Sequence, residues 1–257
     1  GGRVFVMDGE ATVAAIDGAS GQVVWRANLN PNRRRDRYAS GGGLAIVGNR
    51  LFVTTGFRTV SAVDLNTGAV IWTQNTLSPI HNAPTVVGGR VYAITVDNQL
   101  DTFDAATGQP GWRYEALVEP ARILAASSPA VSGDTVVAAF SSGELVALSA
   151  ANGAELWSQQ LSRSSRTTAL SEIRDIPGRP VIFRGEVLAG SHSGVFASVD
   201  LRTGQFRWEP LPISTLSSPW AAGDVVYVTS KAGEVVCVSR SSGQVYWVRD
   251  LNEGRKQ

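Results

Sequence analysis

The stretch Asp64-Leu-Asn-Thr-Gly68-Ala-Val-Ile-Trp72 carries the pattern that decides the fold of this chain. A polar residue, a glycine and a tryptophan follow one another at intervals of four residues, and the same spacing occurs six times. The copies are 17–25, 64–72, 104–112, 149–157, 200–208 and 239–247. Their glycines lie 47, 40, 45, 51 and 39 residues apart, so the chain is a tandem repeat.

Each repeat also has a constant half upstream of this motif. In the third repeat the run RVYAIT (90–95) is followed by a turn at Asp97-Asn98 and by QLDTF (99–103). Such short runs, rich in β-branched and aromatic residues and bounded by turn residues, predict antiparallel strands. No window of a dozen residues has a helical period of 3.6. Each repeat therefore predicts four strands, and repeats of this length and content are typical of β-propeller blades.

The motif itself has a physical explanation. An Asp or Ser oxygen can accept backbone N–H groups in a tight turn, and glycine supplies the positive φ that such a turn needs. The tryptophan then begins the outermost strand and can lie flat against the next blade, where it buries roughly 200 Å². We interpret six tryptophans as structural docking residues, namely Trp25, Trp72, Trp112, Trp157, Trp208 and Trp247.

The sequence thus predicts an all-β fold, a propeller of four-stranded antiparallel blades with about six blades in this chain. The repeats are about 1–29, 40–76, 80–117, 126–161, 178–211 and 216–251. The first repeat enters at its second strand, and nothing after Trp247 resembles the missing one. We therefore expect residues 1–257 to be a single propeller domain that is a fragment of a larger, eight-bladed ring. A closed six-bladed ring is the alternative.

Composition excludes several classes of function. The chain has 257 residues, 43% hydrophobic and 18% charged, which favours a packed core over disorder. A net charge of +1 gives no global electrostatic reason to bind nucleic acid. No apolar stretch approaches the 18 residues of a membrane-spanning helix. One cysteine and two histidines leave little material for a disulfide, a metal cluster or acid–base catalysis. We expect no catalytic residues, no metal and no cofactor.

Three single features receive a structural interpretation. Cys237 lies in an alternating strand pattern and is predicted to be a small core residue. His81 and His192 lie in strand connections and are predicted to be hydrogen-bonded loop histidines rather than ligands. The arginine-rich run Arg33–Arg37 is interpreted as a solvated loop, although it could also bind phosphate, acidic protein or lipid headgroups.

The six motifs resemble the tryptophan-docking repeat of pyrroloquinoline-quinone-type propellers. That superfamily includes alcohol dehydrogenases and binding-only proteins, usually with eight blades, so the fold does not choose between them. The dehydrogenases carry a disulfide between adjacent cysteines and a calcium ion with their quinone. A single cysteine cannot form that disulfide. A quinone-dependent oxidoreductase is therefore one alternative, and a generic periplasmic ligand-binding or sensor propeller is another.

A more specific resemblance lies after Trp157. The loop 158–179, the segment Arg179-Pro180-Val181 and the turn 198–205 (SVDLRTGQ) are similar to the BamB family of scaffold lipoproteins. In that family, two aspartates in this loop contact the barrel-forming subunit of the outer-membrane assembly machine. Asp175 matches the first, whereas Pro177 stands at the position of the second. The family's second contact corresponds to 121–124. The resemblance implies partner-binding roles for Ile173, Arg174, Asp175, Ile176, Arg122, Ile123 and Leu124.

The resemblance also implies a function. We expect a non-enzymatic scaffold that binds the barrel-forming subunit and assists delivery and insertion of unfolded outer-membrane proteins, with no nucleic-acid partner. It would act at the periplasmic face of the outer membrane. Its membrane contact would come through an N-terminal lipid anchor outside this segment.

Overall fold

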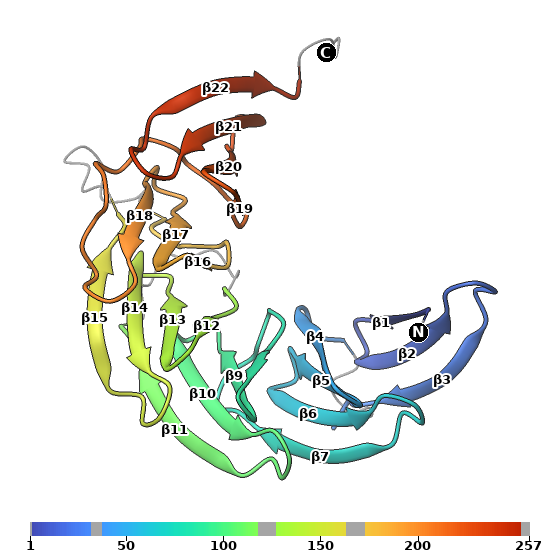
Figure 1. Cartoon of the computed structure of the whole chain (residues 1–257). Coiled ribbons are helices and arrows are strands. Elements are labelled where there is room, and N and C mark those ends of the chain that lie inside the picture. Colours follow the sequence, from blue (N-terminus) through green and yellow to red (C-terminus); the bar gives the residue numbers. More distant parts are fainter. Residues whose placement is uncertain (1, 32–37, 118–126, 163–172, 253–257) are drawn as a thin grey trace. The chain divides into compact units, whose positions relative to one another are not determined.

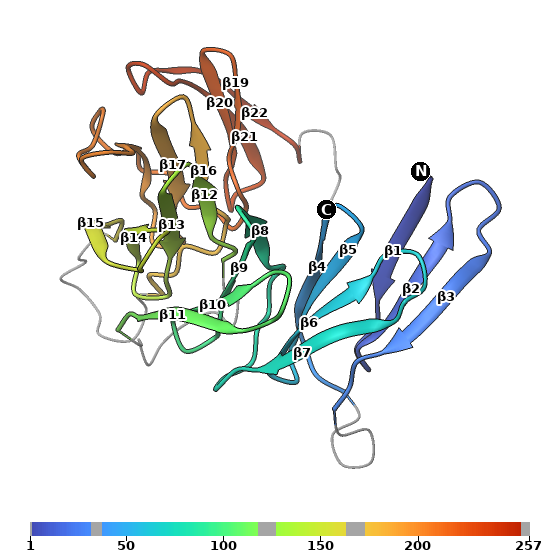
Figure 2. The ribbon, with the colours of Figure 1, turned by 60° about the horizontal axis from the view of Figure 1, so that its bottom comes forward.

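The computed structural model describes residues 2–31, 38–117, 127–162 and 173–252. Within these ranges the chain forms twenty-two strands in six antiparallel sheets and no helix. The absence of helix agrees with the lack of a 3.6-residue period in the sequence. The chain divides into two compact units, Gly1–Glu115 and Ala116–Gln257, and each contains three of the sheets (Figures 1 and 2).

The first unit contains the sheets of the first three repeats. The first sheet has the strands β1 (Arg3–Met7), β2 (Thr12–Asp17) and β3 (Val23–Asn28). The second has β4 (Gly42–Val47), β5 (Arg50–Thr55), β6 (Thr59–Asp64) and β7 (Val70–Asn75). The third has β8 (Thr85–Val87), β9 (Arg90–Ile94), β10 (Gln99–Asp104) and β11 (Pro110–Glu115). In each sheet the strands pair in chain order.

The second unit contains the remaining repeats. Its first sheet has β12 (Ala130–Ser132), β13 (Thr135–Ala139), β14 (Glu144–Ser149) and β15 (Glu155–Gln160). The next has β16 (Val181–Phe183), β17 (Glu186–Gly190) and β18 (Phe196–Asp200). The last has β19 (Trp220–Ala222), β20 (Val225–Thr229), β21 (Glu234–Ser239) and β22 (Val245–Asp250).

The motif turn forms as the sequence predicts. In the second repeat, Asp64 Oδ1 accepts the backbone N–H groups of Asn66 (3.0 Å) and Thr67 (2.9 Å) and the Thr67 hydroxyl (2.9 Å). Gly68 has φ +75° and donates its N–H to the Asp64 carbonyl. The hydrogen bonds from Thr67 lower the pKa of the Asp64 carboxyl. These contacts favour the ionised aspartate and fix the turn between two strands.

The hydrophobic core lies between neighbouring sheets rather than inside any one of them. Four motif tryptophans are buried there, each at 8–9% exposure, and each donates its indole N–H to a carbonyl of the following repeat. The pairs are Trp25–Leu65 (3.1 Å), Trp72–Ala105 (3.2 Å), Trp157–Leu201 (2.8 Å) and Trp208–Arg240 (3.0 Å). The tryptophan of one repeat thus joins it to the motif turn of the next.

The two remaining motif tryptophans differ from these four. Trp112 is partly exposed, and Trp247 is 46% exposed in β22. Trp247 still pairs across the sheet with Cys237, at the position where Ala15, Ala62 and Ala147 oppose the tryptophans of other repeats. Cys237 is buried, and burial raises the pKa of its thiol. The structure therefore confirms that Cys237 is a small core residue.

One sheet departs from the predicted four strands. The first sheet has three strands, as expected for the first repeat, but β16–β18 also has three within the described residues. After the fifth motif, only isolated bridges at Phe206 and Leu211 continue the pairing with β18. Pro210 and Pro212 lack the N–H groups that a ladder needs, so no regular fourth strand forms. The number of blades in the ring, its closure and the single-domain organisation stay predictions.

Candidate functional site

The candidate partner-binding segment lies in the second unit and leads into β16. Of the residues predicted there, Ile173, Arg174, Asp175 and Ile176 are described. Arg122, Ile123 and Leu124 lie outside the described residues, as do 163–172 and the arginine-rich run at 33–37. The geometry of the candidate site therefore rests on 173–180 and on the turns against which this segment packs.

Backbone hydrogen bonds hold the segment between two hairpin turns. The N–H of Ile176 donates to the carbonyl of Phe140 (3.4 Å), at the turn between β13 and β14. The N–H of His192, at the turn between β17 and β18, donates to the carbonyl of Asp175 (2.8 Å). The segment is thus hydrogen-bonded to the sheet β12–β15 on one side and to the sheet β16–β18 on the other.

The same clamp recurs in two other connections between sheets. Ile80 donates to Thr55 while the Pro79 carbonyl accepts from Val96, and Thr215 donates to Ser191 while the Ser214 carbonyl accepts from Lys231. Ile80, Ile176 and Thr215 each precede by four residues the proline that introduces the next inner strand. All three are buried. Ile176 is therefore one instance of a repeated anchor.

Burial separates the four described residues into two pairs. Asp175 is 1% exposed and Ile176 is 2% exposed, and Ile176 belongs to a core cluster with Leu161 and Val195. Ile173 and Arg174 keep part of their surface exposed. Arg174 also packs on Gly143, where an added Cβ would lie 2.9 Å from the Arg174 carbonyl oxygen. The buried pair can set the path of the segment, whereas the half-exposed pair can touch another molecule.

The C-terminal end of the segment is fixed by its neighbouring sheets. Ser127 Oγ donates to the carbonyl of Gly178 (3.0 Å), and the N–H of Arg179 donates to Ser218 Oγ (2.8 Å). An added Cβ at Gly178 would lie 2.4 Å from the Ser217 carbonyl oxygen, so only glycine fits this crossing. Desolvation lowers the pKa of the Arg179 guanidinium. The segment enters β16 with both of its flanks bonded.

His192 joins several of these elements. Its Nε2 lies 2.7 Å from Lys231 Nζ, its carbonyl accepts from Ser214 Oγ (3.0 Å), and its imidazole is hydrogen-bonded to the backbone of Ile173. Burial and the charge of Lys231 lower the pKa of His192, and the bond to Ile173 opposes them. The sequence-based interpretation of His192 as a hydrogen-bonded loop histidine is confirmed.

Sequence reasoning did not connect His192 with Lys231. The two residues occupy the same place in consecutive repeats, two positions before the turn glycines Gly194 and Gly233. Equivalent turns of neighbouring sheets lie side by side, so aligning the repeats on these glycines predicts the contact. The signal was present in the sequence, but it is visible only when the hairpin turns are aligned as well as the tryptophan motifs.

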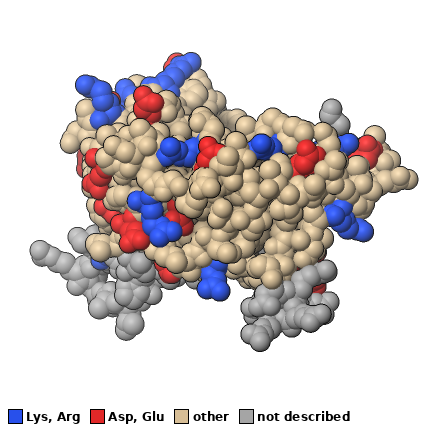
Figure 3. Space-filling view, turned by 90° about the horizontal axis from the view of Figure 1, so that it is seen from below, with Lys and Arg blue, Asp and Glu red and all other residues tan. Residues whose placement is uncertain are grey.

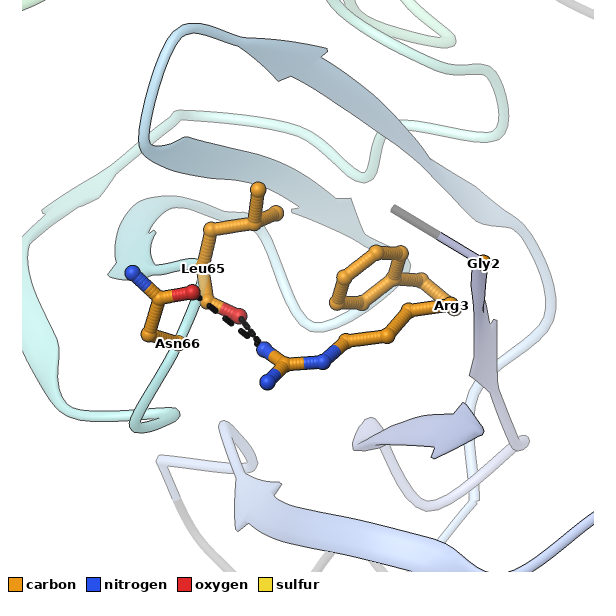
Figure 4. Close-up of a pocket in the computed structure, with 5 residues that line it drawn as sticks. Gly2, Arg3, Leu65 and Asn66 are labelled. Carbon is orange, nitrogen blue, oxygen red and sulfur yellow. Dashed lines mark hydrogen bonds between the residues drawn. The ribbon is translucent and has the colours of Figure 1, made fainter. Parts of the chain in front are cut away.

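The pockets of the described structure arise mainly from packing between sheets. In the pocket of Figure 4, Arg3 Nη1 lies 3.4 Å from the Leu65 carbonyl oxygen and 3.3 Å from Asn66 Oδ1. In a second pocket, Arg50 Nη1 likewise donates to the carbonyl oxygens of Ala105 and Ala106. Because each guanidinium is bonded to backbone carbonyls of the next sheet, these pockets are structural gaps.

A different hollow adjoins His192. It measures about 340 Å³ and is lined by Pro212, Ile213, Ser214, Ser230, Lys231, Ala232, Glu234 and Val236.

On the face seen in Figure 3, acidic and basic side chains are interspersed among a mostly uncharged surface. Within the described residues, no three His, Cys, Asp or Glu side chains are placed to hold a metal ion. The same part of the chain holds no helix that could cross a membrane.

A family model and a curated relative carry the same description. The family model described as outer membrane protein assembly factor BamB matches residues 9–249. The curated protein of that name from Burkholderia pseudomallei is 29% identical over 99% of this chain. The crystal structure of BamB from Moraxella catarrhalis superposes with a TM-score of 0.86 at 23% identity, covering 97% of this chain and 73% of that one.

The same fold also occurs in an enzyme. A europium-containing methanol dehydrogenase matches with a TM-score of 0.72 at 14% identity, over 97% of this chain and 70% of that one. At this identity the likeness shows the fold alone, so it does not assign chemistry. The chain spans 65% of the length of the Burkholderia protein.

Proposed function

This chain belongs to the family of the outer membrane protein assembly factor BamB, and from that premise we propose that it acts as a non-enzymatic scaffold in assembling outer-membrane β-barrels. It binds the barrel-forming subunit of the assembly machine and assists delivery of unfolded outer-membrane proteins. It works on the periplasmic side of the outer membrane, held there by a lipid anchor outside this segment. The family match supports the accessory role, and the candidate site supports a specific contact surface.

One observation supports the contact surface. Ile173 and Arg174 are half-buried in the segment 173–176, which is hydrogen-bonded to a turn on each side. Backbone hydrogen bonds of Asp175 and Ile176 hold that segment to the hairpin turns at His192 and Phe140. A short apolar and cationic pair on a rigid support suits a protein interface, because little conformational entropy is lost on binding. We assign the contact to Ile173 and Arg174, and the support to Asp175 and Ile176.

A binding measurement tests this surface. Arg174→Glu and Ile173→Asp are each assayed for binding to the purified periplasmic domains of the barrel-forming subunit. Each should weaken binding by about tenfold or more, as expected at an interface hot spot. Asp175 is left unchanged because a larger charged side chain at a buried position would disturb the fold.

The control changes an exposed arginine elsewhere in the same unit. Arg202→Glu alters an exposed side chain in the motif turn that follows β18 and should bind like the unmodified protein. Equal thermal midpoints of all three variants would show that the fold is preserved. If both Ile173→Asp and Arg174→Glu bind at full strength while folded, the partner does not use this segment.

The oxidoreductase alternative has its own test. The protein is mixed with pyrroloquinoline quinone and calcium, and its absorbance is followed during a titration. A scaffold leaves the quinone spectrum unchanged, whereas a stoichiometric spectral change would contradict the non-enzymatic proposal.

A further inference from the structure

His192 lies between the segment 173–176, which carries the proposed contact surface, and the last sheet. We propose that it is a positioning residue. Its neutral imidazole holds this segment in place by bridging Ile173 to Lys231. Acidification protonates the ring and therefore loosens the contact surface. The positioning step stands on the geometry of His192, whereas its effect on binding rests on the proposed function. The residue touches no partner itself.

The geometry places His192 in contact with three separate elements. Its backbone N–H donates to the Asp175 carbonyl (2.8 Å), and its ring is bonded to the backbone of Ile173. Its carbonyl accepts from Ser214 Oγ (3.0 Å), in the connection that follows β18. Its Nε2 lies 2.7 Å from Lys231 Nζ, in the turn between β20 and β21. No other histidine in the described residues joins the contact segment to a second sheet in this way.

The contact with Lys231 fixes the protonation state of the ring. A lysine ammonium has only donors, so Nε2 of His192 must accept the hydrogen bond and carry no proton. The single proton of the neutral ring then lies on Nδ1, which leaves that nitrogen to donate to the backbone of Ile173. A second proton on Nε2 would abolish the acceptor and place two cations against each other. The bridge is therefore available only to the neutral ring.

The charged groups on the surrounding elements agree with this assignment. The contact segment contributes Arg174 and Asp175, the β20–β21 hairpin contributes Lys231 and Glu234, and the connection after β18 contributes Glu209. Glu234 Oε2 already accepts a hydrogen bond from Ser230 Oγ (2.9 Å). Lys231 is the charged group in hydrogen-bond contact with the ring in the described structure.

The direction of the pH effect follows from these contacts. Burial, and then the charge of Lys231, lower the pKa of His192 below its ordinary 6.5. A lowered pKa in the folded state means that the bridge contributes fully above about pH 6.5 and is lost as the pH falls through the folded value. The contact surface should thus be held at neutral pH and released in acid.

A titration followed by NMR tests the bridge without any partner. The protein has two histidines, so His81→Asn identifies the His192 ring signals. Lys231→Met should raise the His192 titration midpoint by about 0.5 pH unit, because it removes the neighbouring charge. The amide of His192 should lose hydrogen-exchange protection as the ring becomes protonated. A midpoint that Lys231→Met does not raise, with unchanged amide protection, would overturn the bridge.

A binding measurement at two pH values then tests the positioning role. Binding to the barrel-forming subunit should weaken about fivefold between pH 7.5 and pH 5 in the unmodified protein and in Arg202→Glu, which keeps the bridge, and by less in His192→Asn, which has no ring to protonate. Lys231→Gln keeps a hydrogen-bond donor but removes the charge that lowers the His192 pKa, so its binding should weaken at a higher pH than that of the unmodified protein. A bridge present by NMR with the same pH profile for all variants would refute the positioning role. Loss of all binding at pH 7.5 in the unmodified protein would instead refute the proposed function.

Discussion

The indole of Trp157 lies directly on the backbone of Gly204 in the next repeat. A Cβ added to Gly204 would lie 2.8 Å from the indole ring, and Gly204 has φ +75°. Gly68, Gly108 and Gly243 stand in the same relation to Trp25, Trp72 and Trp208. The glycine and the tryptophan of the motif are therefore coupled across repeats, since each glycine makes room for the preceding tryptophan.

Gly204→Ala should destabilise the protein more than Gly21→Ala. Both glycines have positive φ, but Gly21 has nothing within 4 Å of an added Cβ. Gly21→Ala should therefore cost only the conformational strain, about 1–2 kcal/mol. Gly204→Ala adds a clash with a buried ring and should cost a further 1–3 kcal/mol. Urea unfolding of the two variants measures the difference, and equal losses would show that the tryptophan does not need the glycine.

The tryptophans themselves form a second matched pair. Trp157→Ala removes a buried ring and should cost roughly 3–5 kcal/mol. Trp247 is 46% exposed, so Trp247→Ala in the same 257-residue chain should cost about half as much or less. Thermal unfolding of both variants checks the order. An unchanged midpoint for Trp157→Ala would show that the tryptophan does not dock the two sheets.

The motif aspartates predict an acid dependence of stability. Hydrogen bonds from Thr67 lower the pKa of Asp64, and those from Thr107 lower the pKa of Asp104. A lowered pKa in the folded state gives a contribution that is present above the ordinary 3.8 and is lost as the pH falls through the folded value. The double variant Asp64→Ala/Asp104→Ala should therefore lower the thermal midpoint at pH 6 and lose most of that effect at pH 2.

The control for this prediction is Asp134→Ala, which removes an exposed carboxylate from the turn between β12 and β13. It should leave the pH dependence of the midpoint close to that of the unmodified protein. If the double variant and the control behave alike between pH 6 and pH 2, the turn hydrogen bonds do not contribute.

The spacing of the motif predicted the features that recur with it, whereas the irregular edge of one sheet was missed. The spacing Asp64–Gly68–Trp72 was sufficient for the turn, its positive φ and the docked ring, because each step has a local physical cause. The irregular edge beside β18 was also written in the sequence, at Pro210 and Pro212, but the repeat pattern concealed it. Predicting a feature by analogy with other repeats fails where one repeat breaks the rule.

The candidate site shows a different limit. Ile173, Arg174, Asp175 and Ile176 were assigned together from the resemblance of their loop to the family's partner-binding loop, but a resemblance in sequence does not tell which side chains point inward. Comparison with Ile80, which also lies four residues before a proline, would have identified Ile176 as an anchor. The link from His192 to Lys231 required knowledge of which turns are neighbours in space.

A buried ion pair joins the last two sheets in place of an arginine–carbonyl contact. Arg3 and Arg50 begin their strands and reach to carbonyls of the next sheet. At the equivalent position of β17 the chain has Glu186, and Arg240 of the next repeat pairs with it. Glu186 also accepts from Ser198 Oγ. Arg240 lies 4.5 Å from the ring centroid of Phe183. At this interface the arginine therefore belongs to the later of the two repeats, whereas Arg3 and Arg50 belong to the earlier repeat of their pairs.

Arg240→Leu should destabilise the protein by about 3–5 kcal/mol, since it leaves the Glu186 carboxylate buried without its cation. The double variant Glu186→Leu/Arg240→Leu removes both charges and should recover most of that loss, because the pair's attraction is largely offset by its desolvation. Asp224→Ala, which removes the exposed partner of Arg184, should change stability by less than about 0.5 kcal/mol. Urea unfolding compares the four proteins. A double variant no more stable than Arg240→Leu would show that the sheets need the ion pair itself rather than the absence of an unpaired charge.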